Sequence, residues 1–294
     1  MSRVAAALVA ATTLFSATPR ADTIVIDALG RRVDIPAEPQ RIVTVFSSNT
    51  ELIAALGLAD RIVGIDSMTR YPPEIVSKPH VGGRLGFSVD SIVDQQPDLV
   101  IVTPARQAAN QLIEPMRRLG IPVIVLTARN MSEVMGNLRL VGRATGQQMR
   151  AEIVARALER RMTEAARLSV GRIRPRVVMI TGRIGNGLFL VARPNTYTGD
   201  AMRIAGAEFA LPTLTVLSQV SPEAILASAP DVLLYAGAQS ELDDLKARAG
   251  WRDLTAVKRG HAWTVSRAEW LIPGPRTVNG IEHLANKLHI RDGF

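Results

Sequence analysis

Two stretches of the chain, 133 residues apart, follow one pattern, and this repeat restricts the fold more than any other feature. Ser88–Ile101 (SVDSIVDQQPDLVI) and Ser221–Leu234 (SPEAILASAPDVLL) align without a gap. Each begins with a serine suited to cap a helix, continues with an acidic residue and a short apolar helix, and passes through Pro-Asp into an apolar strand. Such a unit cannot bury its own apolar face. The repeat therefore predicts two similar lobes, unless Ser-x-acid and Pro-Asp are only common punctuation between helix and strand.

The residues around the repeat alternate between predicted strands and helices. Thr23–Ile26 and Arg31–Ile35 predict a hairpin, and His80–Phe87 is predicted as a glycine-rich connection. Nearly continuous apolar runs predict buried strands at Arg41–Phe46, Arg61–Ile65, Leu99–Val102, Ile121–Leu126, Arg176–Thr181, Leu188–Val191 and Ala262–Val265. Helices are predicted at Glu51–Leu56, Gln107–Leu119, Gly199–Ala205, Ser240–Arg248 and Val278–Leu288. This alternation is typical of parallel sheets covered on both faces.

One long helical segment separates the two series of strands. Met131–Leu168 is predicted to be helical with a break near Gly146. Its later part, Gln147–Leu168, would extend about 30 Å at a rise of about 1.5 Å per residue. We therefore predict an α/β fold of two Rossmann-like lobes with mostly parallel sheets, bridged by one long α-helix. The predicted parts are an N-terminal lobe (residues 22–146), the bridging helix (147–170) and a C-terminal lobe (171–294).

The first 21 residues have the pattern of a secretory signal peptide. Arg3 is followed by the apolar run Val4–Phe15 and by small residues up to Ala21. The alternatives are a wrongly assigned start of the chain or a frayed apolar tail. Because the chain has no cysteine, it offers no thiol for a lipid anchor, and no disulfide is expected. We expect a soluble protein of the periplasm, cleaved from its signal.

The charge of the chain does not indicate a nucleic-acid partner. The formal net charge is +8, but the arginines are spread along the chain and aromatic residues make up only 4%. A nucleic-acid surface would require a basic stripe with interleaved aromatics. The excess charge therefore indicates either a scattered arginine surface or an anionic ligand or partner surface.

The motifs of catalysis and of metal binding are absent from the sequence. The segment Arg176–Gly187 has glycines after a strand, but their G-x-x-G-x-G spacing and the strand that follows do not suit a dinucleotide-binding loop. The four histidines have no ligand spacing, so no bare-metal site and no cofactor are predicted. Neither a nucleophile elbow nor a P-loop occurs. The sequence predicts a protein that is not an enzyme.

Four stretches together resemble one family of transport proteins. These are RIVTVFSSNTELIAALGLADRIVGID, the Tyr71-Pro72-Pro73 loop, VGGRLGFSVDSIVDQQPDLVIV and VSPEAILASAPDVLLYAG, and the closing GPRTVNGIEHLANKLH adds a fifth. They look like the substrate-binding proteins of ABC importers for iron-siderophores, vitamin B12 and haem. The resemblance implies two lobes that move little on binding, a ligand in the cleft between them, and a permease with its ATPase as partners. It also implies a monomer.

The resemblance also implies docking residues. In the family, an acidic residue on the outer face of each lobe docks onto arginines of the permease, and these positions fall on Asp90 and Glu223. The usual residue is Glu, so Asp90 departs from the pattern. Without any partner, the helix dipole alone would favour an acid in a first helical turn.

The ligand contacts implied by the resemblance lie in loops at strand ends, and guanidinium groups among them suit an anionic chelate. They are Asn49, Met68, Tyr71, Arg84, Arg106, Arg183, Tyr197, Trp270 and Arg276. Arg84 aligns with an arginine of the family's ferric hydroxamate binder; the vitamin B12 binder has Trp there and Tyr at the place of Met68. Each arginine could instead be a solvated surface residue, and Trp270 and Tyr197 could be ordinary core or rim aromatics.

Three ligands and two other classes of function stay open. A ferric siderophore is the leading prediction, followed by cobalamin or a related corrinoid, and then haem, for which Tyr71 could serve as an axial ligand. The alternatives from other classes are a two-lobed Rossmann-like enzyme, which would require a phosphate-binding loop or a carboxylate pair in the cleft, and a binding module without a permease.

Overall fold

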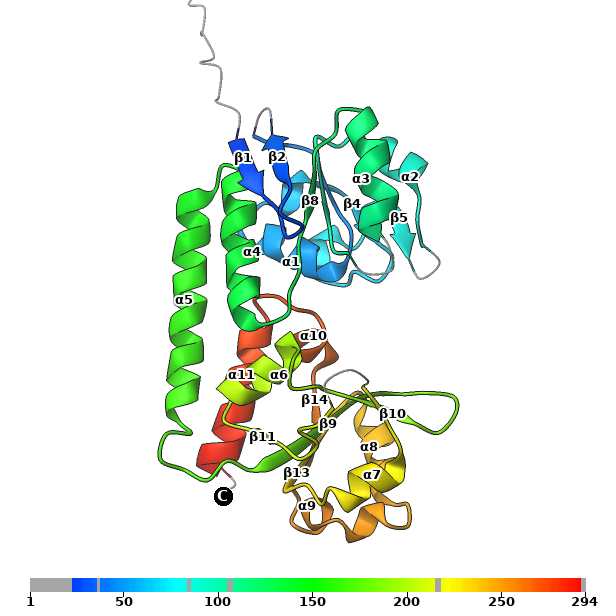
Figure 1. The fold of residues 1–294 in the computed structure, drawn as a ribbon, viewed down its shortest axis with the longest axis vertical. Coiled ribbons are helices and arrows are strands. Elements are labelled where there is room, and N and C mark those ends of the chain that lie inside the picture. Colours follow the sequence, from blue (N-terminus) through cyan, green and yellow to red (C-terminus); the bar gives the residue numbers. More distant parts are fainter. Residues whose placement is uncertain (1–22, 36–37, 84–85, 105–107, 215–217, 292–294) are drawn as a thin grey trace, which may run out of the picture.

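The computed structural model describes residues 23–35, 38–83, 86–104, 108–214 and 218–291. Two α/β lobes lie one above the other, and one long helix runs along the side of both (Figure 1). This arrangement confirms the predicted fold class. The predicted signal segment Met1–Ala21 lies outside the described residues. No helix among those described combines the length and the apolar content that crossing a membrane requires.

The N-terminal lobe is built on a sheet with the strand order β6-β5-β4-β3-β7-β8. All its neighbours are parallel except β5 and β6. The strands are β3 (Ile42–Thr44), β4 (Ile62–Asp66), β5 (His80–Gly83), β6 (Gly86–Phe87), β7 (Leu99–Val102) and β8 (Val123–Val125). The helices are α1 (Ser47–Ala55), α2 (Val89–Val93), α3 (Ala108–Arg118) and α4 (Met131–Ala144). The predicted hairpin is confirmed as β1 (Thr23–Ile26) and β2 (Arg32–Ile35).

One prediction for this lobe is wrong. The sequence predicts a connection at His80–Phe87, whereas β5 and β6 form an antiparallel pair at the sheet edge. Two glycines allow these strands to pair. A Cβ on Gly82 would lie 2.4 Å from the Phe87 ring, and Gly86 has φ 128°, which other residues rarely adopt.

The C-terminal lobe repeats the plan with the strand order β12-β10-β9-β13-β14, and β11 pairs with β9. Its strands are β9 (Arg176–Arg183), β10 (Phe189–Val191), β11 (Glu208–Phe209), β12 (Gln219–Val220), β13 (Val232–Ala236) and β14 (Ala262–Val265). Its helices are α6 (Tyr197–Ile204), α7 (Pro222–Ala227), α8 (Gln239–Lys246), α9 (Thr255–Lys258), α10 (Arg267–Trp270) and α11 (Thr277–Asn286), which continues as a π-helical turn, Lys287–Arg291. The glycine-rich segment after β9 is a hairpin into the antiparallel β10, as the sequence indicated.

The two repeated stretches occupy the same place in the two lobes. In each lobe a serine, Ser88 or Ser221, caps the short helix by accepting a hydrogen bond from the amide three residues later, at 3.1 and 3.2 Å. The helix then leads to the strand beside the first strand of the six-stranded sheet, β7 beside β3 and β13 beside β9. The prediction of two similar lobes is therefore confirmed.

The turn between this helix and its strand is also the same in both lobes. Gln96 and Ala229 stand at equivalent positions and both have positive φ, 48° and 40°. The aspartates that follow, Asp98 and Asp231, accept hydrogen bonds from backbone amides at the start of the neighbouring strand. The repeat thus extends beyond residue type to the backbone conformation and its hydrogen bonds.

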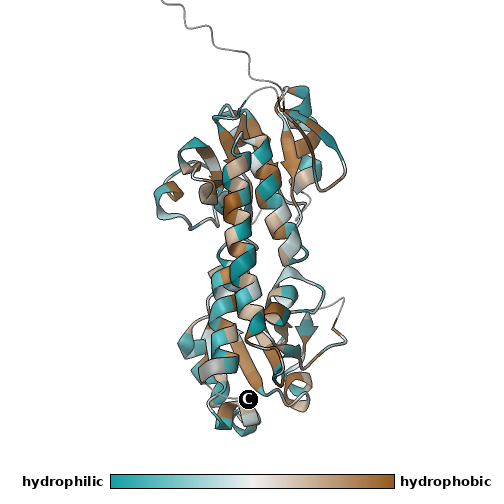
Figure 2. Cartoon of the chain, turned by 90° about the vertical axis from the view of Figure 1, so that its left-hand side faces the viewer, coloured by the Kyte–Doolittle hydropathy of each residue, from teal (hydrophilic) through white to brown (hydrophobic). Residues whose placement is uncertain are grey.

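The long helix α5 (Gln148–Arg167) packs against α4 in the upper lobe and against α11 in the lower one (Figure 1). The predicted break before it is at Gly146, which has φ 71°. Figure 2 shows α5 facing the viewer along both lobes, with the apolar strands behind it.

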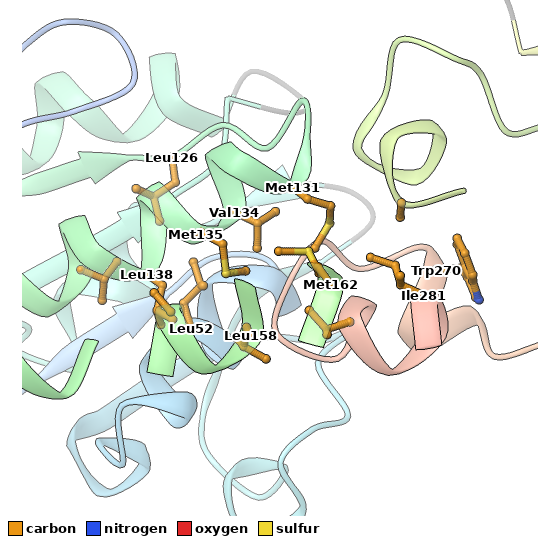
Figure 3. Close-up of a cluster of buried hydrophobic side chains, with 14 of the residues drawn as sticks. Leu52, Leu126, Met131, Val134, Met135, Leu138, Leu158, Met162, Trp270 and Ile281 are labelled. Carbon is orange, nitrogen blue, oxygen red and sulfur yellow. The ribbon is translucent and has the colours of Figure 1, made fainter. Parts of the chain in front are cut away.

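A single apolar core connects the lobes through this helix. Leu52 and Leu126 of the N-terminal lobe, Leu158 and Met162 of α5, and Ile281 of α11 belong to one cluster of buried side chains (Figure 3). Because protein interiors are close-packed, a core shared in this way resists displacement of one lobe against the other.

Close packing of α4 on α5 yields a matched pair of predictions. A Cβ on Gly142 would lie 2.2 Å from the Cβ of Ala151, whereas a Cβ on Gly136, in the same helix, would meet nothing within 4 Å. Gly142→Ala should destabilise the protein by about 1–3 kcal/mol through overpacking. Gly136→Ala should stabilise it by about 0.5–1 kcal/mol, because glycine is a poor helix former. Urea unfolding measures both, and equal effects would contradict the close α4–α5 packing.

Candidate functional site

A cleft of about 600 Å³ opens between the lobes. The loops that follow β3, β4 and β14 supply most of its walls, as in other α/β proteins, where ligands bind outside the carboxyl ends of parallel strands. The lining residues are Phe46, Ser47, Glu51, Asp66, Met68, Arg70, Tyr71, Gly83, Phe87, Arg267, Ala268, Leu271, Ile272 and Arg276.

Aromatic and aliphatic side chains cover much of the cleft. Phe46 and Phe87 meet edge to face with ring centroids 5.3 Å apart. Met68 is 54% exposed and Tyr71 is 40% exposed, so the cleft presents apolar surface to solvent. Isolated apolar residues at a surface are ordinary, but several gathered in one concave site favour a ligand with a large apolar body.

The backbone is strained at the cleft wall. Phe46, between β3 and α1, has φ 79° and ψ 138°, a region that residues with a Cβ rarely adopt. Such a conformation costs of order 1–3 kcal/mol and is found most often at functional sites. Here it places an aromatic side chain in the cleft at the point where the strand becomes a helix.

The lobes are joined at the cleft floor by an ion pair whose carboxylate is buried. Arg276, just before α11, donates from Nε to Oε2 of Glu51 in α1 at 3.0 Å, and its Nη2 donates to Oε1. Glu51 is only 2% exposed. Burial raises the pKa of Glu51, although the bond to Arg276 opposes the rise; this bond also raises the pKa of Arg276. Gly274 allows the loop to approach, since a Cβ there would lie 3.2 Å from Oε2 of Glu51.

Tyr71 completes this group. The guanidinium carbon of Arg276 lies 4.1 Å from the centre of the Tyr71 ring, within the range of a cation–π interaction. Tyr71 belongs to the N-terminal lobe, so Arg276 contacts that lobe through two different side chains.

Two further guanidinium groups face the cleft, one from each lobe. Arg70 donates to the carbonyl oxygens of Ser67 and Thr69, and Arg267 donates to those of Thr181 and Ala236. These bonds fix the position of each group without neutralising it.

Three of the predicted ligand contacts line the cleft: Met68, Tyr71 and Arg276. Arg276 is engaged by Glu51 and Tyr71, and is therefore less available to a ligand than the sequence suggested. Arg84 and Arg106 lie outside the described residues. Whether any of these residues contacts a ligand stays a prediction.

Two predicted ligand contacts have buried side chains, and their ligand roles stay predictions. Asn49 is 1% exposed, and its amide nitrogen donates to the carbonyl of Val45 at 2.5 Å and to Thr103 at 3.3 Å. Trp270 is also 1% exposed and packs in the core that the lobes share (Figure 3). Neither side chain presents a surface to the cleft.

Two other predicted contacts lie away from the lining. Arg183 donates to the carbonyl of Glu241 at 2.9 Å, and its guanidinium lies 5.6 Å from the ring centres of Phe189 and Tyr235. Tyr197 is the first residue of α6, and burial raises its pKa to about 12, with a contribution from the charge of Glu51. Both ligand roles stay predictions.

The two predicted docking residues are exposed and stand in the first turns of α2 and α7. Both helices lie on the side of the molecule away from α5 (Figure 1). Its own backbone amide and the Ser221 hydroxyl lower the pKa of Glu223, so this carboxylate keeps its charge under more acidic conditions than an ordinary glutamate.

Sequence reasoning did not single out Glu51, Phe46, Phe87 or Arg267 as cleft residues. The rule that sites form at the carboxyl ends of parallel strands could have found Phe46 and Arg267, which stand two residues after the ends of β3 and β14. No sequence signal pairs Glu51 with Arg276, because 225 residues separate them.

In the part of the chain that the structure describes, no three His, Cys, Asp or Glu side chains gather closely enough to hold a metal ion. Two α/β lobes, one bridging helix and an apolar cleft between the lobes define a bilobed binding protein. The chain belongs to the periplasmic binding protein family, whose model matches residues 42–266. This confirms the family that the sequence resembles, a family made up of binding proteins.

Similar proteins cover nearly the whole chain. It is 27% identical over 273 residues to the uncharacterized ABC transporter substrate-binding lipoprotein YvrC of Bacillus subtilis (90% of this chain, 84% of that protein). It is 24% identical over 254 residues to the vitamin B12-binding protein of Vibrio parahaemolyticus (82% and 86%). Among solved structures, the periplasmic haem-binding protein RhuT of Roseiflexus sp. RS-1 matches with a TM-score of 0.73 and 27% identity (85% and 98%).

The burial of Asn49 and the exposure of Met68 predict opposite effects of substitution. Asn49→Ala should destabilise the protein by about 1–3 kcal/mol, because it leaves buried polar groups without partners, and should not weaken ligand binding directly. Met68→Ala should change stability by less than about 0.5 kcal/mol and weaken binding, because it removes apolar surface from the cleft. Thermal unfolding and ligand titration of both variants check this. Weaker ligand binding by Asn49→Ala at unchanged stability would instead show that Asn49 contacts the ligand.

Proposed function

We propose that this chain is the substrate-binding component of an ABC importer and works outside the cytoplasmic membrane. It captures a bulky metal chelate in the cleft and presents it to a permease, without chemistry on the ligand. The family match and the ABC substrate-binding relative support this role. The observation that carries it is the cleft itself, which is apolar, open to solvent and held between lobes that share one core.

The ligand that these features support best is a corrinoid such as vitamin B12. The side chains of Phe46, Met68, Tyr71, Phe87 and Leu271 offer broad apolar surface for a large ring system. The name of the Vibrio relative points the same way, and another relative, from Halobacterium salinarum, is a cobalamin-binding protein that is 26% identical over 276 residues.

The ferric siderophore that leads the predictions from sequence is the second candidate. Arg70 and Arg267 supply a guanidinium from each lobe, and these would suit the carboxylate, catecholate or hydroxamate oxygens of an anionic chelate. Haem is the third candidate, and Tyr71 is the residue among the described lining residues that would offer its axial ligand.

Equilibrium titration with cyanocobalamin, haemin and a ferric hydroxamate distinguishes these ligands. We expect cyanocobalamin to bind most tightly, and Arg70→Gln with Arg267→Gln to weaken it less than about tenfold, which is about 1.4 kcal/mol. An anionic chelate should lose more than tenfold, because both its charge partners are removed. Preference for the hydroxamate together with this larger loss would overturn the corrinoid assignment, and the failure of every chelate to bind would overturn the proposed function.

Docking on the permease is proposed for Asp90 and Glu223. Reversing both charges (Asp90→Lys with Glu223→Lys) should abolish uptake in cells that carry this variant as their only copy, while the purified protein keeps its ligand affinity. Loss of the favourable helix-dipole interaction should cost only about 0.3–1 kcal/mol at each site.

A matched control makes the same change of charge elsewhere. Glu164 on α5 and Glu208 on β11 are exposed and stand outside the cleft and the repeated units. Glu164→Lys with Glu208→Lys should leave uptake intact. Unchanged uptake in the Asp90 and Glu223 double variant would show that docking does not depend on these acids.

A further inference from the structure

The ion pair at the cleft floor is part of a row of three side chains that contact one another across the two lobes. Glu51 of the N-terminal lobe bonds Arg276 of the C-terminal lobe. Arg276 in turn lies over the ring of Tyr71, which also belongs to the N-terminal lobe. Two of the three, Glu51 and Arg276, form their charged hydrogen bonds with each other. Tyr71, at 40% exposed, is the most exposed of the three and the one best placed to contact a ligand.

The bond between Glu51 and Arg276 fixes the orientation of the guanidinium. It is bidentate, so the plane of the guanidinium follows the plane of the carboxylate. Glu51 itself is nearly inaccessible to solvent and belongs to a helix, α1, that packs in the shared core through Leu52 and Ile53. The carboxylate is therefore a rigid anchor, and Arg276 has one favoured position over the Tyr71 ring.

The same three side chains separate two cavities. The cleft of about 600 Å³ and a smaller cavity of about 160 Å³ share Glu51, Tyr71 and Arg276 in their linings. Behind this wall the smaller cavity is lined by Ala54, Ala55, Pro72, Glu74 and Pro275. Displacement of Arg276 would leave the Tyr71 ring without its partner and would join the two cavities. The shape of the cleft floor thus depends on a contact between the lobes.

We propose that Glu51 and Arg276 are positioning residues for ligand recognition: they hold the Tyr71 ring as the aromatic floor of the cleft and so make ligand affinity depend on the relative placement of the lobes. The proposal rests on the proposed function, because it concerns the same cleft. Tyr71 then makes the direct contact with the ligand. Arg276, which the sequence predicts as a ligand contact, instead links Glu51 to Tyr71.

The link should weaken on acidification. Because burial raises the pKa of Glu51, this carboxyl takes up a proton at a higher pH than an ordinary glutamate, and a neutral carboxyl holds Arg276 less strongly. The other titratable and charged groups that line the cavities around the pair or act on it are Tyr71, Tyr197, Asp66, Glu74, Glu269, Arg70 and Arg267. Affinity for the ligand should therefore fall as the pH decreases through the raised pKa of Glu51, and Glu51→Gln should remove that dependence.

A double-mutant cycle on cyanocobalamin binding tests the proposal. Glu51→Gln and Tyr71→Ala should each weaken binding about tenfold or more, and the double variant should be little weaker than Tyr71→Ala alone, because both changes remove one contribution. Tyr71→Phe keeps the ring and should restore most of the affinity. Additive effects of Glu51→Gln and Tyr71→Ala, or an unchanged pH profile in Glu51→Gln, would overturn the proposal.

A matched control removes a comparable ion pair elsewhere. Glu38 and Arg61 form a largely buried pair at 2.8 Å within the N-terminal lobe, away from the cleft lining. Glu38→Gln should lower the melting temperature without changing ligand affinity. If Glu51→Gln does not fold, the cycle is completed with Arg276→Lys and Tyr71→Ala, and additive effects there would overturn the proposal in the same way.

A measurement without ligand separates this proposal from the proposed function. The chain has three tyrosines, so protein labelled with 3-fluorotyrosine should give three ¹⁹F resonances, and Tyr71→Phe assigns one of them. Glu51→Gln should shift the Tyr71 resonance and leave that of Tyr235, buried in the other lobe, in place. No shift at Tyr71 would overturn the positioning role even if cyanocobalamin binds. The shift without binding of any chelate would instead leave the positioning geometry intact and refute the proposed function.

Discussion

The packing of α5 against both lobes is the constraint on which the rest of the structure depends. One face of the helix contributes Ala151, Ala155, Leu158, Met162 and Ala165 to the core. The small residues in this row allow close approach, as the contact between Gly142 and Ala151 shows. On its polar side, Arg139 of α4 bonds Glu152 and Glu159, and Arg161 bonds Glu282 of α11, so each half of the helix is tied to a different lobe.

This constraint fixes the distance between the cleft walls before any ligand arrives. Polar contacts between the lobes supplement it, among them the pair of Glu51 and Arg276 and the bond from the amide of Met131 to Asp200 at 2.9 Å. A cleft that is formed in advance loses little conformational entropy on binding. Such a site suits large rigid ligands best, because they cannot change their own shape to fit it.

The sequence could predict the fold because its strongest signals are local and repeated. Serine caps, Pro-Asp turns and apolar runs define short units, and the spacing of two such units revealed the two lobes. The site was less predictable. Resemblance placed Met68 and Tyr71 in the cleft, but it also placed Asn49 and Trp270 there, and both are buried. Side-chain direction at a helix start depends on tertiary packing, which a residue pattern does not contain, and the pairing of Glu51 with Arg276 joins distant parts of the chain.

The shared core has an energetic consequence that the two-lobed outline conceals. Val177 and Met179 of β9 belong to the same buried cluster as Ile42 and Ile62 of the other sheet. Cutting the chain at the junction of α4 and α5 would therefore expose apolar surface on both fragments. The molecule has the shape of two domains. Because the lobes share this core, we infer that it unfolds as one cooperative unit and that neither half would stay folded without the other.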